Sequence, residues 1–132
     1  MRPSPDELAA IPLFESLSED ERDAVANLLE LRSEAEGTEI VTKGDRGAAL
    51  FVIREGTVAV SRDGAQVATL EAGDFFGEFA VMVEGQRNAT VTATSDVTLL
   101  VMYRADFDVF VRDMPGAAAV LRETVERRRP EG

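Results

Sequence analysis

The sequence predicts a mainly β domain with helices at both ends, of the sandwich, barrel or jelly-roll type. Short apolar runs separated by glycine-containing turn signals fill residues 38–103. Apolar residues at helical spacing precede and follow this zone. With 132 residues, 45% of them apolar, the chain is long enough for one core. We therefore expect a single domain over residues 1–132, with helical parts at 5–33 and 105–129.

The N-terminal part carries a helix-start signal. Ser18 and Glu21 have the spacing of a capping box, in which each side chain bonds the backbone N–H of the other residue. The residues that follow at helical spacing are Val25, Leu28, Leu29 and Arg32. The pattern predicts helix to about residue 32.

The central zone divides into short strands at residues 38–43, 50–54, 57–62, 65–70, 91–94 and 97–102, each bounded by turn residues. Asp63-Gly64 is the strongest turn signal, since a tight hairpin needs positive φ at both positions. Seven or eight such strands are expected in all.

The C-terminal part predicts two helices. Phe107, Phe110 and Val111 share one face of a helix over residues 106–112. Pro115 suits the first position of a second helix, which continues to Arg129.

One stretch inside the β zone, FFGEFAVMVEGQRNATVTA at residues 75–93, does not have the pattern of a plain strand. Gly77 breaks the strand, and a short helix after it would offer free backbone N–H groups to an anion. Arg87 supplies a forked cation suited to two phosphate oxygens, and Glu78 can accept a hydroxyl. These residues describe a sugar-phosphate cradle. An alternative remains open, in which Glu78 and Arg87 form a structural ion pair.

This stretch resembles the phosphate-binding cassette of the cyclic nucleotide-binding domain family, which includes the ligand domains of protein kinase A regulatory subunits and catabolite activator protein. The matching residues begin with Phe76-Gly77-Glu78 and end with Arg87-Asn88-Ala89-Thr90-Val91. The resemblance covers nearly the whole chain. It implies an eight-stranded β-jelly roll, also called a double-stranded β-helix, with an N-terminal helix and C-terminal helices.

The resemblance also implies roles for single residues. Arg87 is expected to hold the phosphate oxygens of a cyclic nucleotide and Glu78 the ribose 2′-OH. Backbone N–H groups near Phe79, Ala80 and Ala89 would complete the phosphate contacts, after the turn at Gly77.

Other positions concern the base. Asn88 stands where the family has alanine, serine or threonine, and Gln86 replaces the usual proline. We expect cAMP as the ligand, with cGMP as the alternative; Thr90 would face the base or simply pack. The candidate residues for a lid over the base are Val120, Leu121 and Val125, with Met114 a weaker candidate. The alternative, which the sequence favours for each of them, is a place in the core.

Composition narrows the function classes. With 14 basic and 25 acidic residues, the net charge of −11 opposes binding to nucleic acid and anionic membranes. The absence of histidine and cysteine argues against a metal site, a cofactor and an enzyme of the cupin type. We expect a non-enzymatic, cytoplasmic module that signals through its C-terminal helix to an unknown effector protein, and this helix can also pair with a second copy. The alternative is a degenerate jelly-roll scaffold that binds no nucleotide.

Overall fold

The computed structural model describes residues 2–42, 49–77 and 89–128. Its helices are α1 (Pro5–Leu8), α2 (Glu19–Ala26), α4 (Arg104–Asp113) and α5 (Pro115–Arg128). Its strands are β1 (Glu30–Glu34), β2 (Glu39–Val41), β3 (Ala49–Glu55), β4 (Thr57–Arg62), β5 (Ala65–Glu71), β6 (Phe75–Phe76), β7 (Thr90–Ala93) and β8 (Val97–Tyr103).

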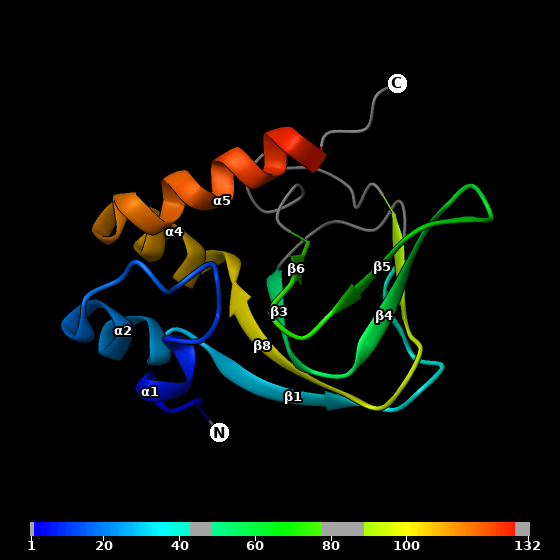
Figure 1. Ribbon diagram of the computed structural model, residues 1–132, viewed down its shortest axis with the longest axis horizontal. Coiled ribbons are helices and arrows are strands. Elements are labelled where there is room, and N and C mark those ends of the chain that lie inside the picture. Colours follow the sequence, from blue (N-terminus) through cyan, green and yellow to red (C-terminus); the bar gives the residue numbers. More distant parts are fainter. Residues whose placement is uncertain (1, 43–48, 78–88, 129–132) are drawn as a thin grey trace.

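The strands form two antiparallel sheets of four strands each. Sheet one has the order β1-β8-β3-β6 and sheet two the order β2-β7-β4-β5 (Figure 1). Neighbours in a sheet are mostly distant in sequence, because the chain passes repeatedly from one sheet to the other. This arrangement confirms the predicted jelly roll of eight strands with flanking helices.

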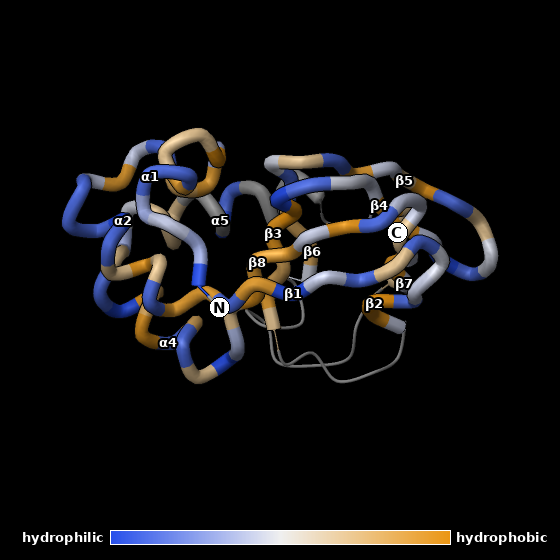
Figure 2. Tube along the Cα trace, turned by 90° about the horizontal axis from the view of Figure 1, so that it is seen from below, coloured by the Kyte–Doolittle hydropathy of each residue, from blue (hydrophilic) through white to orange (hydrophobic). Residues whose placement is uncertain are grey.

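The elements lie in three layers. Figure 2 shows the helices gathered at one side, the strands of sheet one in the middle and those of sheet two beyond them. Alternate residues of β3 therefore enter different cores: Leu50 packs with the helices, whereas Phe51 packs with sheet two. Because both faces of sheet one are covered, β3 and β8 are continuous apolar runs rather than alternating ones.

The helical layer is held by aromatic side chains. Phe14 and Phe110 are fully buried and meet edge to face, with ring centroids 6.3 Å apart. The ring centroid of Phe107 lies 6.1 Å from that of Phe110, and Val111 packs against the same cluster. These contacts confirm the predicted apolar face of α4. Pro115 begins α5, also as predicted.

The capping box and the main hairpin are also confirmed. The Ser18 side chain accepts from the Glu21 backbone N–H at 3.1 Å, and the Glu21 carboxylate accepts from the Ser18 backbone N–H at 2.9 Å. Asp63 and Gly64 have φ values of 52° and 82° and join β4 to β5, with Arg62 paired to Ala65.

The predicted helix to residue 32 is wrong in its second half. Helix α2 ends at Ala26, and residues from Glu30 form β1, which pairs with β8 from Glu30↔Val101 to Glu34↔Val97. Leu28 and Leu29 satisfied the helical pattern because both pack against the helical core from the turn that follows α2. Pairing with β8, a partner distant in sequence, decided the conformation of the next residues.

Candidate functional site

The segment predicted to bind the ligand begins at the end of β6. Phe76 pairs with Phe51 of β3, and their rings stack with centroids 5.0 Å apart and an interplanar angle of 13°. Gly77 follows with φ +85°, a conformation that side chains other than glycine rarely adopt. The predicted turn at the start of the segment thus coincides with a backbone position that requires glycine.

The segment ends in the other sheet. Ala89 is buried, and β7 begins at Thr90, paired with both β2 and β4. Val91 and Ala93 enter the core between the two sheets. Residues 78–88 therefore connect an anchored strand of sheet one to an anchored strand of sheet two.

Most of the predicted contact residues lie outside the described residues: Glu78, Phe79, Ala80, Arg87 and Asn88. Their roles stay predictions. Of the others, Gly77, Ala89 and Thr90 are described. Thr90 pairs with Ser61, and the neighbouring pair along the strands is Val60↔Val91. Because side chains alternate along a strand, Thr90 points to the face of sheet two opposite to the face that carries Val60 and Val91.

The candidate lid residues are in α5, and the side chains of Val120, Leu121 and Val125 also lie outside what is described. Met114, the weaker candidate, is 3% exposed and belongs to the helical core. In Figure 1, α5 extends from the helical side toward the strands.

Arg62 is a residue that our sequence reasoning missed. In β4, Val58 and Val60 point into the core between the sheets, and the alternation of a strand places Arg62 on the same face. Its Nε atom is buried and has no hydrogen-bond partner within the described ranges. The signal was present in the sequence: Arg62 continues the spacing of Val58 and Val60.

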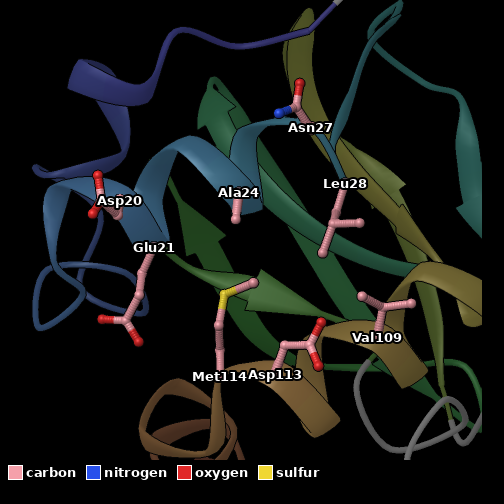
Figure 3. Close-up of a pocket in the computed structure, with 8 residues that line it drawn as sticks. All are labelled: Asp20, Glu21, Ala24, Asn27, Leu28, Val109, Asp113 and Met114. Atoms are coloured by element: carbon pink, nitrogen blue, oxygen red, sulfur yellow. The ribbon is translucent and has the colours of Figure 1, made fainter.

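A cavity lies away from this segment, between α2 and α4. Figure 3 shows its lining of Asp20, Glu21, Ala24, Asn27, Leu28, Val109, Asp113 and Met114, around a cavity of about 440 Å³. Asp113 pairs with Arg112 at 3.0 Å, and this hydrogen bond and charge raise the pKa of the exposed Arg112. Three carboxylates on one hollow would repel a phosphate, so this cavity is a poor site for an anionic ligand.

Among the described residues, no group of three or more carboxylates lies close enough together to hold a metal ion. No helix in the same ranges is sufficiently long and apolar to span a membrane.

Comparison with known proteins decides the family. The family model described as the cyclic nucleotide-binding domain matches residues 31–114. The chain belongs to the cyclic nucleotide-binding domain family. The match spans β1 to Met114 and includes the whole segment 75–93.

Two curated relatives of this family show how much of a longer protein the chain corresponds to. It is 37% identical to a cyclic nucleotide-gated potassium channel of Rhizobium etli, over 92% of this chain and 34% of the channel. It is 34% identical to the cyclic AMP receptor protein of Thermus thermophilus, over 89% of this chain and 56% of that protein. The chain thus spans between a third and somewhat over half of these relatives.

A solved structure supports the same family. The cAMP-bound PfPKA-R, residues 141–441, superimposes with a TM-score of 0.86 at 27% identity, covering 93% of this chain and 43% of that one. The jelly roll with its flanking helices is therefore the cyclic nucleotide-binding fold.

Proposed function

We propose that the chain is a regulatory module without enzymatic activity that binds a cyclic purine nucleotide, with cAMP as the favoured ligand, through residues 75–93. One observation carries the proposal: the segment with the family's Phe-Gly-Glu and Arg motif starts at a left-handed glycine on sheet one and ends at buried Ala89 on sheet two. Both ends of the cradle are thus fixed by strands, as a preorganised ligand site requires.

The roles within the segment follow its chemistry. Arg87 holds two phosphate oxygens, and its permanent charge attracts the anion against a net charge of −11. Glu78 accepts the ribose 2′-OH. Backbone N–H groups of Phe79, Ala80 and Ala89 bind the remaining phosphate oxygens, while Asn88 bears on the choice between the two nucleotides.

The output of the module is proposed to be a movement of α5. This helix follows directly on α4, with Met114 between them and Ala117 and Ala118 buried against the helical core. Val120, Leu121 or Val125 covers the base, and the shifted helix is read by an effector protein or by a second copy of the chain. Neither nucleic acid nor a membrane is a proposed partner, and the proposed location is the cytoplasm.

Ligand binding is tested by the melting temperature, which rises when a ligand binds the folded state alone. We expect cAMP to raise it, and Arg87→Ala to remove most of the rise. Two lost charge-assisted hydrogen bonds weaken binding by about a hundredfold or more. Arg112→Ala is the matched control, because this exposed arginine lies on α4, outside the segment.

A titration calorimeter provides the independent readout. Neither heat nor thermal shift with millimolar cAMP or cGMP would contradict the proposal and support the non-binding scaffold. The 2′-deoxy analogue of cAMP tests Glu78 separately: we expect it to bind more weakly, and equal binding would show that Glu78 has another role.

A further inference from the structure

The cavity between α2 and α4, which we name the α2–α4 groove, is formed by helix faces that do not enter the helical core. Val25 of α2 and Phe110 of α4 are fully buried in that core. The groove is lined instead by their neighbours Ala24 and Val109, which are turned by about 100° around each helix (Figure 3). Each helix thus has one side in the core and a second side toward the groove.

The groove has an apolar floor and an acidic rim. Its floor includes Met114, which is 3% exposed, and the half-buried side chains of Leu28 and Val109. The exposed carboxylates of Asp20 on α2 and Asp113 on α4 lie on different walls. A depleted-charge centre inside a charged rim is typical of a surface that binds another protein.

The negative charge of the rim is not neutralised from within the groove. Asp20 forms no ion pair with another described residue, and Asp113 pairs with its neighbour Arg112 on the exposed surface. Arg22 of α2 donates to the backbone carbonyl of Leu17 at 2.6 Å. No arginine or lysine of the described ranges lines the groove. The rim therefore favours a cationic occupant.

The shape of the groove favours a helix as that occupant. Its volume of about 440 Å³ lies within the range of roughly 300–1,000 Å³ that ligand pockets have. It runs between two helices, and a third helix fits such a trough with its side chains at i, i+3, i+4 and i+7. A small inorganic cation would leave the apolar floor in contact with water.

We propose that the α2–α4 groove binds a cationic amphipathic helix of a separate partner protein. The apolar side of that helix packs on Leu28, Val109 and Met114, and its lysines or arginines lie against Asp20 and Asp113. The groove shares no residue with the segment 75–93, so its binding of a helix does not depend on the nucleotide.

The groove also meets the proposed output of the domain. Met114 is the single residue between α4 and α5, and it belongs to the floor of the groove. A docked helix therefore contacts the start of α5, and a movement of α5 alters the floor. This connection alone rests on the proposed function.

The probe is a blocked synthetic peptide of about 18 residues, built from leucine, lysine and alanine, with leucines at i, i+3, i+4 and i+7. Its dissociation constant is measured by fluorescence anisotropy without nucleotide, at about 150 mM NaCl, where charges more than about 8 Å away are largely screened. We expect a micromolar constant. A peptide of equal composition with its leucines spread around the helix should bind about tenfold more weakly.

Two variants test the place of binding. Ala24→Gln puts a larger neutral side chain into the groove at an exposed helical position, where glutamine is a good helix former, and should weaken binding by about tenfold. Asp20→Asn combined with Asp113→Asn removes two rim charges and should weaken it by about fivefold.

The matched controls make the same changes outside the groove. Ala105→Gln alters an exposed alanine of α4, and Glu55→Gln combined with Glu71→Gln removes two exposed charges from β3 and β5. Both should change the constant by less than about twofold. Melting curves without peptide establish that each variant is folded.

Three results would overturn the proposal. One is the absence of binding up to millimolar peptide. Another is equal affinity for the two leucine arrangements, or equal losses in groove and control variants, since binding would then follow net charge alone. The third is dimerisation of the protein without peptide, seen by analytical ultracentrifugation and abolished by Ala24→Gln, which would make a second copy the occupant.

The connection to α5 is tested by the same titration at saturating cAMP. We expect the dissociation constant of the peptide to change by about fivefold or more in the wild type, and to stay unchanged in Arg87→Ala. An unchanged constant in a wild type whose melting temperature rises with cAMP would contradict the connection and leave the groove. A wild type that binds the peptide but shows no response to either nucleotide would contradict the proposed function alone.

Discussion

At Gly56 the backbone leaves no room for a side chain. This residue joins β3 in sheet one to β4 in sheet two with φ +97°. A Cβ atom there would lie 2.5 Å from the carbonyl oxygen of Asp96 and 2.6 Å from a methyl group of Val97. The crossing between the sheets therefore depends on glycine for both conformation and space.

We expect Gly56→Ala to lower the free energy of unfolding by about 2–5 kcal/mol. The left-handed conformation costs alanine roughly 1–2 kcal/mol, and the enforced overlap adds about 1–3 kcal/mol. Urea unfolding measures the difference.

Gly64→Ala is the matched control for this prediction. Gly64 has φ +82° in the hairpin, but a Cβ atom there would meet nothing within 4 Å. Only the conformational cost of about 1–2 kcal/mol should remain. Equal losses for the two variants would show that the contacts around Gly56 relax.

The conformation of a single residue was predictable from the sequence where the local backbone geometry accepts only a few residue types. Asp63-Gly64 is an example, since a tight turn selects these residues directly. Arg62 was missed because a charged residue at a strand end normally lies in solvent, whereas here the side chain is half-buried and its Nε atom is fully buried. The roles of Glu78 and Arg87 remain predictions carried by the motif.

At the scale of single elements, α2 owes its start to local hydrogen bonds. Two reciprocal bonds between Ser18 and Glu21 satisfy donors that no helical carbonyl can reach. The helix has eight residues, too few to be stable without such a cap and the packing of Val25.

We expect Ser18→Ala to lower the free energy of unfolding by about 0.5–2 kcal/mol, measured by urea unfolding. Ser4→Ala is the comparison variant, since Ser4 caps α1, a helix of four residues, through a longer bond of 3.4 Å. The free energy of unfolding should fall less for Ser4→Ala than for Ser18→Ala. A loss at Ser4 as large as that at Ser18 would contradict this ranking.

Strand β1 shows where prediction of elements from local pattern fails. The residues Glu30–Glu34 have little apolar character, so nothing local distinguishes helix from strand. Their conformation follows from β8, which offers a paired edge about 70 residues later in the chain. By contrast, α4 was predictable because Phe107 and Phe110 mark its buried face themselves.

The whole molecule carries a net charge of −11, and the ion pairs Arg32–Glu34, Glu7–Arg54 and Arg112–Asp113 are all at least partly exposed. Repulsion among like charges destabilises the compact state, and salt screens it. Surface pairs such as Arg32–Glu34 contribute little to the free energy of unfolding. Screening of these pairs by salt should therefore lower the stability only slightly.

We therefore expect the melting temperature to rise between 10 mM and 500 mM NaCl, in the absence of ligand. A gain of about 1 kcal/mol would correspond to roughly 3–6 °C for a chain of this length. KCl at equal ionic strength should give the same shift, because the effect is screening. A melting temperature that falls with salt would show that attractive pairs outweigh the repulsion.

The overall architecture was predictable because strand density, turn signals and the cassette motif all favour the same fold. The order of strands within the sheets was not, since it depends on pairing between segments far apart in sequence. The apolar run of β3 indicated that the strand is buried. It did not indicate that its side chains enter two different cores, because this follows from the helices packing on one face of sheet one and sheet two packing on the other.

The position of β8 inside sheet one has a consequence for synthesis on the ribosome. β8 is the last strand among the residues that the structure describes, yet it lies between β1 and β3 and pairs with both. Until residue 103 has emerged, β1 has no strand beside it and β3 lacks one of its two neighbours. A nascent chain halted before β8 would thus expose apolar strand edges and bind chaperones, whereas one halted after it could close the sheet.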